Sequence, residues 1–503
     1  MIDVLAIIYI IQKGIKKERF INGKIDIFIL ILCCSSCIPI IFDTYTSLND
    51  SIAFILKYSS IFLAYLVTKD VVMNNKKTEN YIIYIILSMA VVLVILGIDR
   101  LTYHYFKPAL EFFNITNFYQ EEIRITSLFS YANSLAATVV CGIFLSLGQS
   151  LISSKTVIKG VNQTIIFILL VGLILSLSRM MYLITGIVSV IYLLINKGKE
   201  KKIEIIENLM SAGILSIIYS TIFMKLFLAG NYIAIWISFL GLSVLSSITV
   251  VFFKYINIKL LKIQKRTFIK ISILGIIFII VILIIAIIVP ENLVMFNNKN
   301  SKNEIERHLS KINGNERYIL KFEIDANSID NQNIFQIKVL ERDEYWNDLN
   351  STIIQFGNYK GIKEIELHTH PKTTDIYLVF SSVEITESTK LEITNFEING
   401  KKEYLNYKFL PYDVVSKIKN INFQTQSVVD RGTYIKDAIK LIKDNWLFGI
   451  GGDGWNYRYP EVQEYTYVAR EVHSYPVKIF LEFGIVRIYF LLYYFNIYIK
   501  AKL

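Results

Sequence analysis

Residues 271–289 read "ISILGIIFIIVILIIAIIV", a run without a single charged side chain. A helix needs about 20 consecutive apolar residues to cross a bilayer, because lipid offers no hydrogen-bond partners to an open backbone. Five other stretches are long and mostly apolar: 25–41, 51–68, 81–98, 132–152 and 476–499. With 53% hydrophobic residues in 503, the chain is too apolar for an ordinary soluble protein. The sequence therefore predicts an α-helical polytopic membrane protein.

The positive charges predict how the chain crosses the membrane. The net charge is +11, and the basic residues cluster beside the apolar stretches, at 13–24, 69–77, 155–159, 197–202, 254–270 and 500–502. Short basic segments beside spans are typical of cytoplasmic loops, so this charge does not indicate a nucleic-acid partner. The apolar runs 164–196 and 208–253 are basic on both sides, so each must turn back, near Ser178–Arg179 and near Ala229–Tyr232. Counting a weak span at 2–12, we expect about eleven spans in the cell membrane, with the N-terminus outside.

The long segment 290–475 then lies on the extracytoplasmic side. Within it, the residues from Arg317 to Phe409 contain stretches that alternate apolar and polar side chains, the pattern of half-buried strands. These predicted strands are 318–324, 334–341, 363–368, 375–380, 390–398 and 403–409. Asn399–Gly400 is a typical two-residue hairpin turn between the last two. Several short strands at such spacing predict an inserted β-sandwich.

These patterns divide the chain into four parts. We expect a transmembrane bundle over 1–290 and an extracytoplasmic insert with the sandwich over 291–425. An outer amphipathic helix with a glycine-rich loop follows over 426–475, and a last transmembrane helix covers 476–503.

Three short motifs suggest cofactors but are better explained otherwise. "GIGGDG" at 449–454 matches a dinucleotide fingerprint, yet residues 433–445 before it have a helical period, so the glycines end a helix instead of opening one. "CCSSC" at 33–37 lies inside an apolar stretch, where small residues favour helix packing. His368 and His370 share one face of a predicted strand without a third metal ligand nearby. We therefore expect no nucleotide or metal cofactor.

Residues 431–484 contain a further series of elements in a fixed order. Arg431 begins the amphipathic helix, which ends in an Asp-x-x-Leu-x-Gly-x-Gly turn; tyrosines, a His-Ser-Tyr motif and a Glu-x-Gly motif follow. The residues are Asp444, Leu447, Gly449, Gly451, Tyr457, Tyr459, His473, Ser474, Tyr475, Glu482 and Gly484. Upstream, "RITSLFSYANSLA" carries Arg124 and Asn133, and "LSLSRMMYLITGIV" carries Arg179. The series resembles the O-antigen ligase and O-antigen polymerase family of polytopic membrane glycosyltransferases.

The resemblance implies a GT-C-like helical fold and a glycan donor carried on a polyprenyl pyrophosphate at the outer membrane face. The acceptor would be a glycan, a lipid or a protein, and one more span would follow residue 503. The residues implied as catalytic are His473, Arg431 and Arg179; those implied to bind substrate are Arg124, Asn133, Tyr457, Tyr459 and Tyr475. Guanidinium groups stay charged and grip phosphate oxygens in a fork, and an imidazole suits a base near neutral pH.

Two other readings stay open. A transporter or flippase of lipid-linked sugars is also polytopic, although it predicts ionisable residues within spans and an internal repeat. A non-catalytic or truncated relative would share the same motifs. The sequence does not separate glycan ligation, glycan polymerisation and protein glycosylation.

Overall fold

The computed structural model describes residues 2–19, 21, 23–108, 124–129, 131–260, 284–285, 287–297, 304–309, 312–328, 335–343, 347–382, 389–410, 412, 415, 426–463 and 467–502. The chain forms two compact units, each described here by itself. One contains Met1–Ile82 together with Asn422–Leu503, and the other contains Ile83–Ile421.

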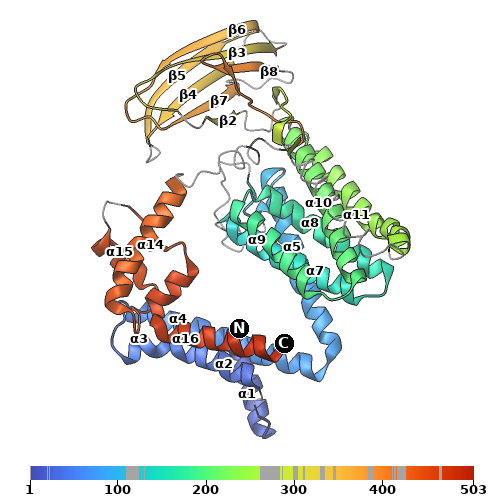
Figure 1. Cartoon of the computed structure of the whole chain (residues 1–503), viewed down its shortest axis with the longest axis vertical. Coiled ribbons are helices and arrows are strands. Elements are labelled where there is room, and N and C mark those ends of the chain that lie inside the picture. The colour runs from blue at the N-terminus through green and yellow to red at the C-terminus, as the bar shows by residue number, and fades with distance from the viewer. Residues whose placement is uncertain are drawn as a thin grey trace. The chain divides into compact units, whose positions relative to one another are not determined.

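The first unit joins both ends of the chain in one helical body (Figure 1). Its N-terminal elements are α1 (Ile2–Ile15), α2 (Lys24–Cys34), the 3-10 turn η1 (Ser35–Cys37), α3 (Ile38–Ile41) and α4 (Leu48–Asn74). Its C-terminal elements are α14 (Gln426–Asn445), α15 (Gly454–Val462) and α16 (Tyr475–Lys502). Helix α16 packs against α14, α2 and η1, so the segment with the family motif rests on the N-terminal helices.

The helices of the second unit pack with α8 at their centre. They are α5 (Lys76–Leu101, which begins in the first unit), α7 (Ala132–Ile152), α8 (Thr156–Leu175), α9 (Arg179–Ile195), α10 (Lys199–Leu228) and α11 (Tyr232–Leu260). Helix α8 contacts α7, α10 and α11, and most of its side chains are buried. Gly172 allows α8 to approach α5, because a Cβ there would lie 2.4 Å from Val94 Cγ2. The predicted turns near Ser178–Arg179 and near Ala229–Tyr232 are confirmed.

The described residues form a helical membrane protein with about six long apolar helices: α4, α5, α7, α8, α10 and α11. Large apolar side chains are exposed along them, as lipid contact requires; on α11 these include Ile237, Leu240, Val244 and Ile248. The structure therefore does not show the eleven spans that the sequence predicts. The stretch 25–41 is interrupted where η1 replaces an α-helical turn ahead of Pro39, which cannot donate a helical hydrogen bond. Apart from 284–285 and 287–289, the span expected at 271–289 lies outside the described residues.

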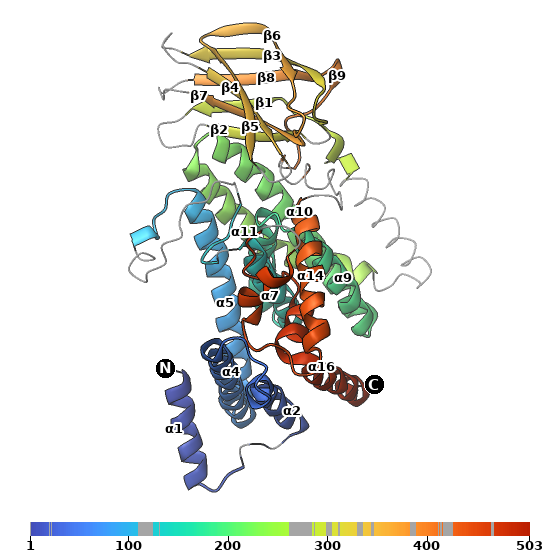
Figure 2. The same ribbon diagram turned by 90° about the vertical axis from the view of Figure 1, so that its left-hand side faces the viewer.

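The β-structure consists of two antiparallel sheets that share one core (Figure 2). The strands are β1 (Leu293–Asn297), β2 (Glu304–Leu309), β3 (Arg317–Ser328), β4 (Phe335–Arg342), β5 (Asp348–Phe356), β6 (Tyr359–His368), β7 (Asp375–Ser382), β8 (Thr389–Ile398) and β9 (Lys401–Lys402). One sheet has the order β1-β8-β3-β6, with β9 paired to β8, and the other has the order β2-β7-β4-β5. The Phe322 ring from one sheet meets the Phe380 ring from the other at 6.2 Å, edge to face.

Five predicted strands correspond to β3, β4, β6, β7 and β8, and the Asn399–Gly400 hairpin is present, with positive φ at both residues as a type I′ turn requires. The structure adds β1, β2 and β5, which the sequence did not predict. The strand expected at 403–409 is wrong, because β9 ends at Lys402 and the chain leaves the sheet toward α10, where the Thr221 hydroxyl donates to the Phe409 carbonyl.

Candidate functional site

The glycine-rich turn after α14 and the break in α16 are one structural unit. Gly449 and Gly451 have φ values of 77° and 81°, and Gly484 interrupts α16 with a φ of 71°. The turn pairs with the broken helix through Ile450 N to Leu481 O and Gly451 N to Glu482 O, both 2.9 Å. The Ile485 amide donates back to the Trp446 carbonyl at 2.8 Å. Backbone hydrogen bonds between the two glycine motifs therefore hold both of them in place.

Side chains are excluded at this crossing. A Cβ on Gly484 would lie 2.1 Å from the Leu447 carbonyl oxygen, and a Cβ on Gly449 would lie 2.4 Å from the Glu482 carbonyl. Neither backbone group can rotate away as a flexible side chain would. Left-handed φ values add a second reason for glycine at both positions.

We expect Gly484→Ala to destabilise the protein by about 2–5 kcal/mol, since left-handed backbone costs an L-residue about 1–2 kcal/mol and overpacking about 1–3 kcal/mol. Gly432→Ala is the matched control, because Gly432 lies on α14 with no atom within 4 Å of an added Cβ. Alanine there should stabilise the helix by up to about 1 kcal/mol. Thermal unfolding of the purified full chain measures both changes, and equal melting temperatures for the two variants would contradict the crossing's importance.

A buried carboxylate fixes the next part of the turn. Glu482 is 1% exposed, and its Oε1 accepts from the Asp453 amide at 3.0 Å. Lys478 Nζ lies 3.8 Å from Glu482 and 2.6 Å from Glu471 Oε2. The Glu-x-Gly motif thus holds the start of α15 through its carboxylate and the turn through its glycine.

Arg431 and His473, both predicted as catalytic, lie in the same neighbourhood of the first unit. Arg431 is on α14, and His473 is in the segment that leads into α16, where its φ is 57°. The Tyr434 ring, one turn after Arg431, lies 5.8 Å from the imidazole. Neighbouring groups partly desolvate the exposed His473 side chain, and this desolvation, followed by the nearby Arg431 charge, lowers the pKa of His473 below its usual value. The imidazole is therefore neutral at pH 7 and can accept a proton.

The three predicted tyrosines have different surroundings. Tyr475 is 65% exposed, and its hydroxyl lies 3.4 Å from the Tyr58 hydroxyl on α4. Tyr457 is also exposed and donates to Asp50 Oδ2 at 2.7 Å. Tyr459 instead packs inward, with ring centroids 5.5 Å from Trp455 and 5.6 Å from Tyr467. The side chains of Tyr457 and Tyr475 are thus exposed, whereas Tyr459 packs against the helices behind them.

The other predicted residues gather in the second unit, at the turn before α9. Arg124 Nε donates to the Ser176 carbonyl at 2.8 Å. Ser178, the residue before Arg179, donates to Asn133 Oδ1 at 2.7 Å. Arg179 is exposed at the first position of α9. The structure therefore brings Arg124, Asn133 and the Arg179 turn together, and it brings Arg431, His473 and Tyr475 together in the other unit.

The sequence analysis missed the polar residues that support the cluster of Arg431, His473 and Tyr475. Asp50 follows the Ser47 cap of α4, and Ser47 Oγ lies 2.5 Å from its carboxylate. Arg487 is buried in α16 at 4% exposure. A charged residue inside an apolar stretch is itself a functional signal and could have identified Arg487.

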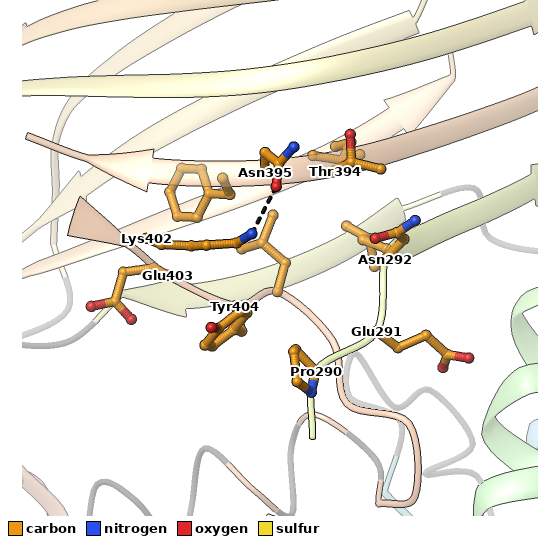
Figure 3. Close-up of a pocket in the computed structure, with 12 residues that line it drawn as sticks. Pro290, Glu291, Asn292, Thr394, Asn395, Lys402, Glu403 and Tyr404 are labelled. Carbon is orange, nitrogen blue, oxygen red and sulfur yellow. Dashed lines mark hydrogen bonds between the residues drawn. The ribbon is translucent and has the colours of Figure 1, made fainter. Parts of the chain in front are cut away.

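A hollow of about 90 Å³ lies at one edge of the β-structure, and none of the predicted site residues lines it (Figure 3). Its polar lining includes Asn292, Asn395, Lys402, Glu403 and Tyr404. Lys402 Nζ donates to Asn395 Oδ1 at 2.7 Å, and the amides of Asn395 and Asn292 bond Glu323 and Glu392. Its amides and lysine are thus already paired within the fold.

The two predicted histidines lie at the last residue of β6 and two residues after it. His368 lies 3.2 Å from Glu366 on an exposed strand, and His370 Nδ1 accepts from the Lys372 amide. Within the part of the chain that the structure describes, no three histidine, cysteine, aspartate or glutamate residues are grouped as metal ligands.

Comparison with known proteins identifies the region that carries Arg431, His473 and Tyr475. Residues 388–492 match the family model for O-antigen ligase. This range includes Arg431, the glycine turn, His473 and the Glu482–Gly484 motif, and it does not reach Arg124 or Arg179. A search of curated proteins and a search of solved structures each found no match. The C-terminal region of this membrane protein therefore matches the O-antigen ligase family model.

Proposed function

We propose that the protein is a membrane glycosyltransferase that transfers or polymerises a glycan from a polyprenyl pyrophosphate at the outer face of the membrane. The observation that carries the proposal is that the region matching O-antigen ligase contains His473 with Arg431 close enough for its charge to act on the imidazole. The acceptor is a hydroxyl of a glycan or lipid, or a protein side chain. The expected product is surface polysaccharide.

The chemistry needs one base and several cations. The acceptor hydroxyl attacks the anomeric carbon of the donor sugar, and the bond from that carbon to the pyrophosphate oxygen breaks. The hydroxyl proton passes to the imidazole of His473, and polyprenyl pyrophosphate leaves with the bonding electrons. Arg431 and Arg179 bind the phosphate oxygens where negative charge develops, which is the role of preorganised donors. Because the leaving group is already activated, the reaction requires neither a nucleotide nor a metal.

The remaining predicted residues either position these groups or contact the substrate. Arg124 and Asn133 hold the turn that presents Arg179, through Ser176 and Ser178. Tyr457 and Tyr475 expose rings and hydroxyls in the first unit, which suits contacts to sugar or isoprenoid.

Glycan transfer distinguishes this function from transport of lipid-linked sugars. In membranes that contain the full chain, a labelled glycan on polyprenyl pyrophosphate should move to an acceptor, with one polyprenyl pyrophosphate released for each glycan transferred. A flippase would move the intact donor across the bilayer and release no pyrophosphate lipid. Movement of the donor without any release would contradict the proposal.

Topology gives an independent prediction. We expect Lys77, in the first turn of α5, to face the cytoplasm, and Arg317, on β3, to face outward. In a variant without the four native cysteines, an impermeant thiol reagent should label Arg317→Cys in intact cells and label Lys77→Cys only after lysis. Labelling of Lys77→Cys in intact cells would invert the topology and remove the proposed outer active site.

A further inference from the structure

The guanidinium of Arg487 is enclosed by helices of the first unit. The guanidinium carbon of Arg487 lies 4.2 Å from the Tyr58 ring centroid on α4 and 4.2 Å from the Phe483 ring centroid on α16. Its Nη1 donates to the Ser36 hydroxyl of η1 at 2.8 Å. Three elements thus enclose one guanidinium, which is 4% exposed.

The charge of Arg487 has no ion-pair partner among the described residues. Among the described residues, no carboxylate lies within 4.0 Å of its guanidinium, and its Nε is buried without an acceptor. Glu482, earlier on the same helix, accepts from the Asp453 amide and lies beside Lys478 instead. Aromatic rings offset part of the cost of a buried cation, but an unused buried donor and an unpaired charge remain unfavourable.

The location of Arg487 connects it to the proposed site. It follows Gly484 by three residues, just after the break at which α16 meets the glycine turn. The Tyr58 ring that stacks on it also places its hydroxyl 3.4 Å from that of Tyr475, two residues after His473. A charged residue in an apolar helix usually faces a partner or a ligand pathway.

We propose that Arg487, with the Ser36 hydroxyl, binds a phosphate group of a lipid. The unpaired Nε–H is available as a donor, and Ser36 retains its own O–H because its oxygen accepts from Arg487. Tyr58 covers one face of the guanidinium, so binding requires this ring to move and its contact with Tyr475 to change. The phosphate is supplied by the polyprenyl pyrophosphate donor or by a phospholipid headgroup. The first source rests on the proposed function; the second does not.

Arg487→Met tests the site, because methionine packs between rings without a charge. The full chain is placed in nanodiscs of zwitterionic lipid, and polyprenyl pyrophosphate is the probe, with phosphatidylglycerol as competitor. We expect Arg487→Met to weaken binding about tenfold or more, the usual loss for a hydrogen bond to an ionised group. Arg317→Met is the matched control, since Arg317 pairs with Glu366 on an exposed strand, and its binding should equal that of the wild type.

The melting temperature without ligand separates ligand binding from a structural role. Removing an unpaired buried charge should leave this temperature unchanged or raise it. Unchanged binding by Arg487→Met would overturn the proposal, as would a lower melting temperature or failure to fold. Displacement of the probe by equimolar phosphatidylglycerol assigns the site to headgroups; failure to displace it assigns the site to the pyrophosphate lipid. If the wild type binds the probe but transfers no glycan, the proposed function fails while this anion site stands.

Discussion

Arg431→Lys is expected to lower glycan transfer about 100-fold or more. Lysine keeps the positive charge but loses the planar fork that grips two phosphate oxygens. One hydrogen bond to an ionised group is worth about 1.5–3 kcal/mol, and one donor directed at developing charge about 100- to 1,000-fold in rate. Initial rates of transfer from a polyprenyl pyrophosphate donor in membranes measure the effect.

Arg179→Lys should show a loss of the same order, because its guanidinium is also proposed to bind phosphate oxygens of the donor. Arg317→Lys is the matched control: Arg317 is exposed on β3 and pairs with Glu366 at 2.6 Å, so its replacement should leave transfer unchanged. Near-normal transfer by Arg431→Lys would exclude the bidentate role. A loss in Arg431→Lys alone would remove Arg179 from the reaction and leave it as an interfacial residue at a helix start.

The helical part was predicted where the hydropathy pattern was unambiguous. The stretch 132–152 agrees with α7 at both ends, and the turn before Arg179 lies where the flanking lysines placed it. The stretch 25–41 is apolar and helical but shorter than the six long helices, and hydropathy does not register that the 3-10 turn Ser35–Cys37 interrupts it just before Pro39. Hydropathy indicates whether a segment contacts lipid. Whether its helix is continuous depends on the backbone hydrogen bonds that its residues can make.

The strands show the opposite limitation. Alternation found β3 and β8, whose inward side chains are strongly apolar. It missed β5, "DLNSTIIQF", because this strand lies at the end of its sheet and exposes residues on both faces. Residues 403–409 alternate apolar and polar side chains well, but the strand pairing with β8 ends at Lys402. The chain then turns toward the helices. Pairing partners, which one strand's sequence does not contain, decided both outcomes.

The motif residues of the candidate site were predicted from the sequence, and the residues that support them were missed. Glycines 449, 451 and 484 were recognised as part of a resemblance, and the structure supplies their reason. Two backbones cross at Gly449 and Gly484, where no Cβ fits, and a Cβ on Gly451 would meet Ser51 and Tyr45. Asp50 and Arg487 belong to the same neighbourhood through contacts between residues about 400 or more positions apart. Such contacts leave no periodic signal in a single sequence.

His473→Asn is expected to lower transfer by about 100- to 10,000-fold, the usual contribution of a positioned general base, with donor affinity nearly unchanged. Asparagine suits this position better than alanine, because His473 has a φ of 57° and asparagine tolerates left-handed backbone. The variant therefore removes the base without adding backbone strain. Rates under saturating donor, together with equilibrium binding of the donor, measure the two effects. Loss of donor binding equal to the loss of rate would assign His473 to binding instead of proton transfer.

The pH dependence tests the same base without removing it. Partial desolvation and the Arg431 charge hold the pKa of His473 below its usual value, so the imidazole loses its basic form only as the pH falls through that lowered pKa. The pH profile of kcat/KM should therefore decline on its acid side below about pH 6.5. Glu471 raises the pKa of His473, so Glu471→Gln should lower that pKa further and move the acid decline to lower pH. A shift to higher pH, or an acid decline that persists unchanged in the residual activity of His473→Asn, would show that another group accepts the proton.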